Sequence, residues 1–266
     1  MKPERAFYDL QLRFARAAAR LADIPLAAAL LDCTNLYVRF GAGRNFDRTH
    51  PLWAAYVDGL DEHASVVEQC EWTWRYLQDC PTHQSAPAVA VTVGCFSYAQ
   101  EPHGGVRLHF NARTDNGMSP LDSRQLAARQ DELRTLIDQL RAQLRASGHA
   151  SSDVCVHGTS WLYNVPAYRR LFPSAYIASA QPVARLRALS LWGQFLGRNG
   201  CVRNDAAAML LARIERASAF ADLLSCFPLQ ALAVQASVEV FADRKRTGTV
   251  TKDFRGNCNS VRERGD

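Results

Sequence analysis

The chain has 266 residues, 48% hydrophobic and 21% charged, which is the composition of a globular protein with a core of its own. No apolar run approaches the roughly 20 residues that a membrane-spanning helix needs. The first 25 residues are rich in arginine but lack the layout of a signal peptide. These features predict a cytoplasmic protein with no membrane partner.

The net charge of +5 is concentrated at one end of the chain. Residues 244–266 hold seven basic and three acidic side chains, which leaves only about +1 for residues 1–243. Globular proteins that bind nucleic acid usually carry a basic surface on their folded part. We therefore expect a disordered basic tail over residues 244–266, and no contact with nucleic acid except through that tail.

Residues 1–85 are predicted to form a helical N-terminal region. Apolar residues recur at helical spacing over residues 4–22, and Pro25 ends this first helix. A second helix is predicted to run without a break from Leu26 to Phe40. A further helix is predicted to begin at Asp61-Glu62, because acidic residues are favoured in the first turn.

A glycine-rich loop follows the second predicted helix. Gly41, Gly43, Arg44 and Asn45 resemble a fragment of a phosphate-binding loop. No strand precedes them and no GK[ST] sequence follows, however, so a helix C-cap and an ordinary loop are favoured.

Residues 86–243 are predicted to form an α/β sheet domain. Apolar residues alternate with other residues over 89–95 and 106–110, which predicts a β-hairpin. A long amphipathic helix is predicted over 119–146, and a strand over 153–157 follows it. A strand, helix and strand of this length form a βαβ unit with parallel strands.

The expected fold is therefore of the α+β class. The helical N-terminal half is expected to pack on a mixed β-sheet that has the βαβ unit at its core. A last strand is predicted over residues 232–240, where apolar residues alternate again.

Ligands of open α/β sheets bind at the carboxyl ends of parallel strands. The two predicted parallel strands end at residues 109–115 and 157–164, which should wall one cleft. His157 and His109 are the candidate catalytic residues, because an imidazole pKa near neutrality suits acid–base chemistry. The candidate ligand-binding residues are polar or aromatic groups near these ends: Asn111, Asp115, Ser160, Trp161, Tyr163, Asn164, Tyr168 and Arg169.

Structural roles are the favoured alternative for several of the same side chains. Asn111 and Asp115 can shape the loop before the long helix, Ser160 or Asn164 can cap a short helix, and Trp161 can pack in a core. The eight cysteines show no C-x2-C or C-x4-C spacing and no H-E-x-x-H sequence occurs, so no metal site is expected.

Three short motifs follow one another along the chain. They are LHF at residues 108–110, SPLD at 119–122 and SWLYN at 160–164. Their order resembles an acyltransferase-like family in which a helical N-terminal domain precedes a GNAT-like (N-acetyltransferase-like) domain. This resemblance implies a protein that acts on or binds a small molecule, with acyl-CoA as the donor.

GNAT enzymes hold the pyrophosphate of acyl-CoA on a Q/R-x-x-G-x-G/A segment between a strand and a helix. This chain has the residues Ala112 to Met118 there, without that pattern. More closely, residues 25–240 resemble an uncharacterised bacterial family that carries the motifs SWLYN and AYRRLFP. The alternative function is a non-catalytic binding or scaffold module that keeps the fold.

Overall fold

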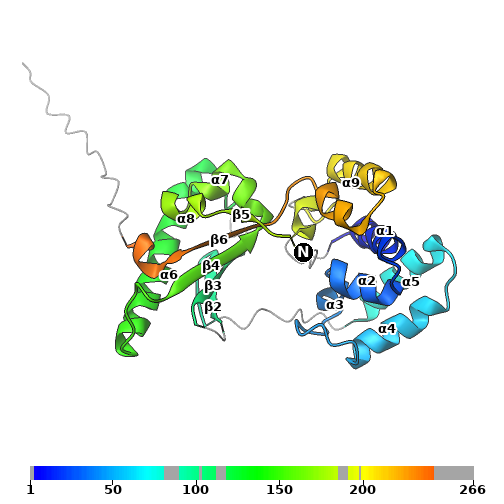
Figure 1. Ribbon diagram of the computed structural model, residues 1–266, viewed down its shortest axis with the longest axis horizontal. Coiled ribbons are helices and arrows are strands. Elements are labelled where there is room, and N and C mark those ends of the chain that lie inside the picture. Colours follow the sequence, from blue (N-terminus) through cyan, green and yellow to red (C-terminus); the bar gives the residue numbers. More distant parts are fainter. Residues whose placement is uncertain are drawn as a thin grey trace, which may run out of the picture.

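The computed structural model describes residues 3–80, 90–101, 104–111, 118–184, 191–197 and 199–242. These residues form a mixed α and β protein with two lobes, one helical and one built on a six-stranded sheet (Figure 1). The predicted α+β class is thus confirmed. The predicted tail over residues 244–266 and the candidate residue Asp115 lie outside the described residues.

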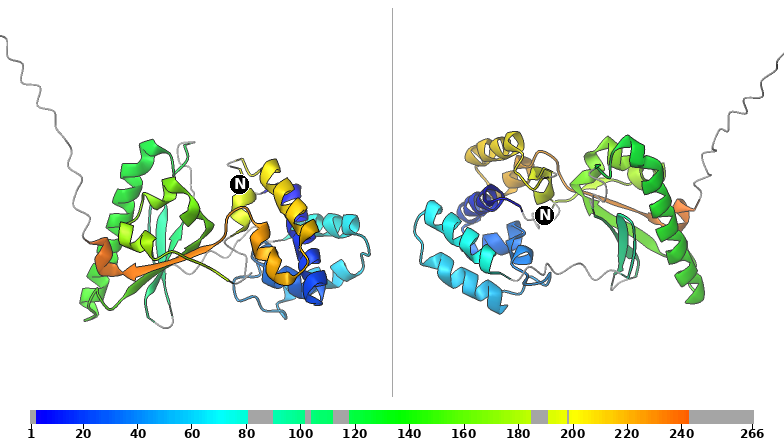
Figure 2. Two further views of the ribbon diagram at one scale, coloured as in Figure 1. Left: turned by 45° about the horizontal axis from the view of Figure 1, so that its top comes forward. Right: turned by 180° about the vertical axis from the view of Figure 1, so that it is seen from behind.

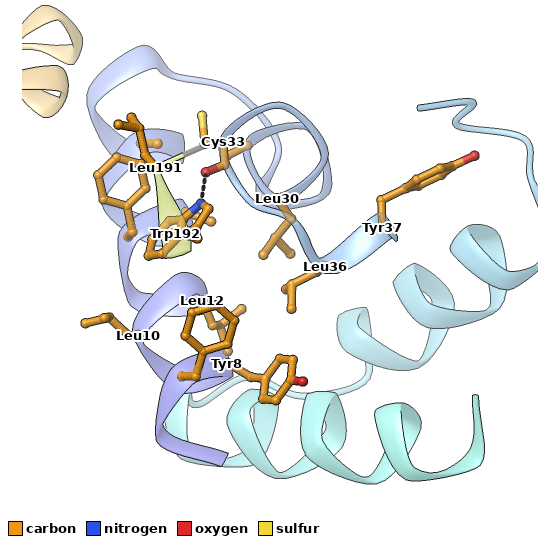
Figure 3. Packing of buried hydrophobic residues seen from close by; sticks show 14 of the residues in the cluster. Tyr8, Leu10, Leu12, Leu30, Cys33, Leu36, Tyr37, Leu191 and Trp192 are labelled. Atoms are coloured by element: carbon orange, nitrogen blue, oxygen red, sulfur yellow. Dashed lines mark hydrogen bonds between the residues drawn. The ribbon is translucent and has the colours of Figure 1, made fainter. Parts of the chain in front are cut away.

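The helical lobe combines N-terminal and C-terminal segments of the chain (Figure 1). Its helices are α1 (Arg5–Ala22), α2 (Leu26–Cys33), α3 (Leu36–Arg39), α4 (Pro51–Asp61), α5 (Val66–Asp79), α9 (Asn204–Arg216) and α10 (Leu223–Cys226). Phe14 of α1 packs against the rings of Trp192 and Phe227, with centroids 5.4 and 5.0 Å away. The Trp192 indole N–H donates to the Cys33 carbonyl at 3.0 Å (Figure 3).

Two helix boundaries in this lobe differ from the sequence-based expectation. The predicted helix from Leu26 to Phe40 is broken at Thr34, whose backbone is extended and whose hydroxyl donates to the Leu30 carbonyl. The helix expected to begin at Asp61 begins at Val66 instead. Ser65 and Glu68 form a capping box there, which satisfies two backbone N–H groups reciprocally.

The sheet has the order β1-β2-β3-β4-β6-β5. Its strands are β1 (Val91–Val93), β2 (Phe96–Gln100), β3 (Val106–Phe110), β4 (Cys155–Ser160), β5 (Gln181–Pro182) and β6 (Leu232–Ser237). β2 and β3 form an antiparallel hairpin, and β3 and β4 are parallel with α6 (Leu126–Ala146) between them. The predicted βαβ unit is therefore confirmed, although α6 begins seven residues later than the sequence suggested.

β3 and β4 separate soon after they pair. Their parallel register has two pairs, Val106 with Val156 and Arg107 with His157. β3 continues to Phe110 and β4 continues to Ser160. Within the described residues, these last residues of β3 do not pair with the last residues of β4, which leaves a gap between the two strands. We call residues 108–110 and 158–160 the diverging ends.

One face of the sheet packs against α6 and the segment that follows β4. That segment holds a 3-10 turn (Trp161–Asn164), α7 (Pro166–Arg169) and α8 (Ser174–Ala178). Val106, Leu108 and Val156 point into this core, because alternate residues of a strand face the same side. Its aromatic side chains are Phe96, Tyr98, Tyr163, Tyr168, Phe172, Tyr176 and Phe241.

The N-terminal helices have their own hydrophobic core rather than a place on the sheet. Two separate clusters of buried residues exist among the described residues, one in each lobe. The chain leaves the sheet lobe after β5 and returns at β6, and residues 191–231 complete the helical core between these points (Figure 2). The sequence analysis assigned these residues to the sheet domain over 86–243. Local patterns in a sequence do not indicate which of two hydrophobic cores a segment packs into.

Candidate functional site

The face of the sheet that α6 leaves uncovered carries two of the predicted histidines. Arg107 and His109 alternate with the buried residues of β3, so they lie on this open face. His157 lies on the same face, directly beside Arg107 in the parallel register. Both histidines are half-buried. The structure therefore brings together the two candidate catalytic residues, one on each side of the point where the strands separate.

The Glu101 carboxylate lies between the side chains of Arg107 and His157 on the open face. Its Oε1 atom accepts hydrogen bonds from Nε and Nη2 of Arg107 at 2.9 and 2.7 Å. Its Oε2 atom lies 3.8 Å from Nε2 of His157. Gly105 makes this approach feasible, since its φ is 95° and a Cβ there would lie 2.9 Å from the Cys155 carbonyl oxygen.

A basic side chain from the other lobe also acts on this face. Arg44 lies in the loop between α3 and α4, and that loop is on the side of the helical lobe that faces the sheet (Figures 1 and 2). Burial, followed by the charges of Arg107 and Arg44, lowers the pKa of His109 below its ordinary value of 6.5. The imidazole of His109 is therefore neutral at pH 7, as a proton acceptor needs to be.

We expect the imidazole of His109 to titrate below pH 6.5, because burial and then the charges of Arg107 and Arg44 disfavour its charged form, against the smaller opposite effect of Glu101. The folded state then binds fewer protons than the unfolded state, so stability falls as the pH drops from 6.5 towards the folded pKa. A histidine-resolved NMR titration measures this pKa. Arg107→Gln and Arg44→Gln should each raise it, and a pKa of 6.5 or above in the intact protein would contradict this placement.

The tyrosines among the candidate ligand-binding residues lie on the opposite face of the sheet. Tyr163 and Tyr168 are each 3% exposed and belong to the core under the sheet. The hydroxyls of Tyr163 and Tyr176 share a hydrogen bond of 3.1 Å directly over Gly158. Burial raises the pKa of Tyr163 to about 12, so its hydroxyl stays protonated at physiological pH.

Other candidates of the SWLYN segment hold the backbone in place. The Ser160 hydroxyl accepts from the Leu162 N–H at 3.1 Å and so caps the turn after β4. The Asn164 amide donates to the carbonyls of Trp161 and Gln230, at 2.9 and 2.8 Å. This second bond ties the turn to the chain just before β6.

The last three candidates lie outside β3 and β4. Trp161 is partly buried and packs against the core of the helical lobe. Asn111 is exposed after the end of β3, and Arg169 is exposed on α7. The predicted residues therefore do not line a single cleft. The histidines lie on the open face of the sheet, and the tyrosines lie in the buried aromatic layer on its other face.

Three residues of the open face were not among the sequence-based candidates. Arg107 could have been found, because its spacing of two from His109 places both on one side of a strand. Glu101 carries no such signal, because a turn brings it to Arg107. Arg44 belongs to the glycine-rich loop noted in the sequence, but nothing in that pattern relates it to His109.

Comparison of the chain with protein-family models, curated proteins and solved structures finds no match. Within the parts of the chain that the structure describes, no group of three or more His, Cys, Asp or Glu side chains is arranged to hold a metal ion. In those same parts, no helix combines the length and the apolar character needed to cross a bilayer.

Proposed function

We propose that this chain is an acyltransferase-like protein with a GNAT-like sheet lobe. Its donor would be a thioester on a pantetheine arm, such as acyl-CoA, and its acceptor an amine. The separation of β3 and β4 after Arg107 and His157 is the observation that carries the proposal. The strand order, with β6 between β4 and β5, supports the GNAT-like part.

The diverging ends suit a thin ligand that carries amide groups. Strand edges that face each other without pairing present backbone N–H and C=O groups that need partners. An extended ligand can add between them as a further strand does. A pantetheine arm has this shape and carries amides along its length. Below the gap, the Phe110, Tyr168 and Tyr163 rings follow one another at 5.1 and 5.2 Å and offer an apolar wall.

The start of α6 does not fit the pyrophosphate of acyl-CoA. Among the described residues there, the Asp122 carboxylate accepts from the Arg124 N–H at 3.0 Å and pairs with the Arg124 guanidinium. A carboxylate at the N-terminal end of α6 repels a phosphate, because both groups are negatively charged. The donor is therefore held by its arm, and its phosphate end makes few contacts with this helix.

His109 is the residue that we assign to proton transfer. When bound, the thioester supplies an activated acyl carbonyl. As the amine attacks, the carbon–nitrogen bond forms and the carbon–sulfur bond breaks, and the proton lost by the amine passes to the neutral imidazole of His109. His157 belongs to the last residue pair of β3 and β4, before the gap, and it lies beside Glu101. It is therefore the second candidate for proton transfer.

Titration of the full-length protein with acetyl-CoA and longer acyl-CoAs tests this proposal. We expect heat in calorimetry and shifted backbone amide signals at residues 108–110 and 158–160. With small amines as acceptors, His109→Gln should retain binding but lower thiol release about 100-fold or more. His149→Gln, in the exposed turn after α6, is the matched control. Absence of heat and of any thermal shift with every acyl-CoA would overturn the proposal.

The alternative function is a non-catalytic binding module. It is favoured by the structural roles of Ser160, Tyr163 and Asn164, which leave few polar groups free in the SWLYN segment. Acyl-CoA binding with no thiol release over a panel of amines, and no effect of His109→Gln, would decide for this alternative.

A further inference from the structure

We infer that a pocket between α2 and α4 binds an ω-amino acid, a small molecule whose amine and carboxylate are joined by an apolar chain. The pocket has a volume of about 320 Å³, which is within the range of ligand-binding cavities. Its lining comes from the start of α2, the residue Arg48 and one side of α4, all of them in the helical lobe (Figure 1). This site does not depend on the proposed acyl transfer.

Small side chains leave the space between the two helices open. Ala27 and Ala28 of α2 and Ala54 of α4 line the pocket, and each has only a methyl group to fill it. Trp53 also lines the pocket. This side chain is 2% exposed and packs against the ring of Tyr37 with the centroids 5.5 Å apart, so it is held in place. An apolar segment of a ligand therefore meets a preformed apolar surface here.

Two side chains of opposite charge complete the lining, Arg48 and Asp58. Both are exposed. Within the part of the chain that the structure describes, neither side chain forms a hydrogen bond or an ion pair, so each is available to a charged group of a ligand. The start of α2 adds positive charge, because its N-cap residue, Pro25, provides no side-chain cap and the helix dipole attracts anions.

The turn that carries Arg48 is held on both sides. The Asp47 carboxylate accepts from the N–H and the hydroxyl of Thr49 at 2.8 and 2.7 Å, and these bonds lower the pKa of Asp47. The Asp47 N–H donates to the Tyr37 hydroxyl at 3.1 Å, and the His50 N–H donates to the Asp47 carbonyl at 3.2 Å. The neighbouring carboxylate is thus directed to Thr49, and Arg48 extends from a defined backbone.

The separation of the two charges indicates the kind of ligand. Arg48 precedes α4, whereas Asp58 lies in the last turn of that helix. The helix axis rises roughly 10 Å from Pro51 to Asp58. An α-amino acid carries both charges on one carbon atom and does not span this separation. A molecule with several methylene groups between an ammonium and a carboxylate does, and its apolar middle then lies against the alanines of the pocket.

Three probes of matched length test the inference on the full-length protein. They are 6-aminohexanoate, hexanoate and hexylamine, each added at constant ionic strength while the backbone amide signals of Ala27 and Ala54 are followed by NMR. We expect 6-aminohexanoate to shift these signals saturably. Hexanoate and hexylamine each lack one charge, so each should bind about fivefold more weakly than 6-aminohexanoate.

Two single variants assign each charge of the ligand to one side chain. Arg48→Gln should weaken 6-aminohexanoate and hexanoate about fivefold and should not weaken hexylamine, because it removes the partner of the carboxylate. Asp58→Asn should weaken 6-aminohexanoate and hexylamine and should not weaken hexanoate. Asp61→Asn on α4 and Arg75→Gln on α5 are the matched controls, since both residues are exposed and lie outside the lining.

Three outcomes would overturn the inference. The first is the absence of a saturable shift at Ala27 and Ala54 with 6-aminohexanoate. The second is equal affinity for all three probes, because the charges would then contribute nothing. The third is a loss of affinity in Arg48→Gln or Asp58→Asn that is no larger than in the control variants. None of these outcomes affects the acyl-CoA titration, whose reporters are residues 108–110 and 158–160, so failure of this site is distinguishable from failure of the proposed function.

Discussion

Replacing Trp192 with alanine is expected to lower the free energy of unfolding by about 3–5 kcal/mol. Trp192 has no exposed surface and packs on Phe14, Phe195 and Phe227. Its indole N–H also satisfies the carbonyl of Cys33 at the end of α2 (Figure 3). The alanine variant leaves both a cavity and an unpaired buried carbonyl, so urea unfolding followed by circular dichroism should show the full loss.

The conservative variant separates these two contributions. Trp192→Phe keeps most of the apolar volume but removes the donor to Cys33, so a loss of about 1–3 kcal/mol is expected from the unsatisfied carbonyl. Met209→Ala, at a side chain that is 43% exposed on α9, is the control and should cost little. Hydrogen exchange should speed up in α1, α2 and α9 rather than in β2 to β4. A Trp192→Ala loss no larger than that of the control would contradict the packing of residues 191–231 on the N-terminal helices.

Replacing Gly158 with alanine is expected to cost about 1–3 kcal/mol, because the added methyl group overfills the core under the sheet. A Cβ at this position would lie 2.1 Å from the Tyr163 hydroxyl and 2.5 Å from the Tyr176 hydroxyl. Both tyrosines are buried, so neither ring can move away without disturbing its neighbours. The loss is measured as a shift in the urea midpoint at constant slope.

A rescue experiment makes this prediction specific. Tyr163→Phe and Tyr176→Phe together remove the two atoms that the new methyl group meets and both partners of their shared hydrogen bond. The double variant also removes the bond between Tyr163 and the buried Tyr168, so it has a cost of its own and serves as the reference for Gly158→Ala in that background. Gly158→Ala should therefore be tolerated better in that double variant than in the intact protein. Gly193→Ala is the matched control, since its Cβ would make an ordinary contact of 3.5 Å with Trp161. Equal losses from Gly158→Ala in both backgrounds would show that the tyrosine hydroxyls do not lie over β4.

Local patterns in the sequence predicted much of the secondary structure. The helix over residues 4–22 follows from periodic apolar residues, and the βαβ unit follows from two short strand-like stretches around a long amphipathic helix. Boundaries failed where side chains compete for backbone groups, as at Thr34 and Ser65.

The candidate site was predicted less completely than the fold. The placement of His109 and His157 on one face was accessible, because alternation and parallel pairing both follow from the βαβ pattern. The roles of Tyr163 and Asn164 were not, because a hydroxyl or an amide in a turn looks the same in a sequence whether it holds a ligand or the backbone. Whether these side chains also contact a ligand stays a prediction.

The sequence by itself determined the α+β class and the βαβ unit, because these depend on periodicity within short stretches. It placed His157 at the end of its strand, whereas β4 continues to Ser160 and His157 lies inside it. Only the tertiary structure decided which core residues 191–231 join, where β3 and β4 separate, and that Arg44 acts on His109. Each of these depends on contacts between segments far apart in the chain, and such contacts are set by shape and packing rather than by any local pattern.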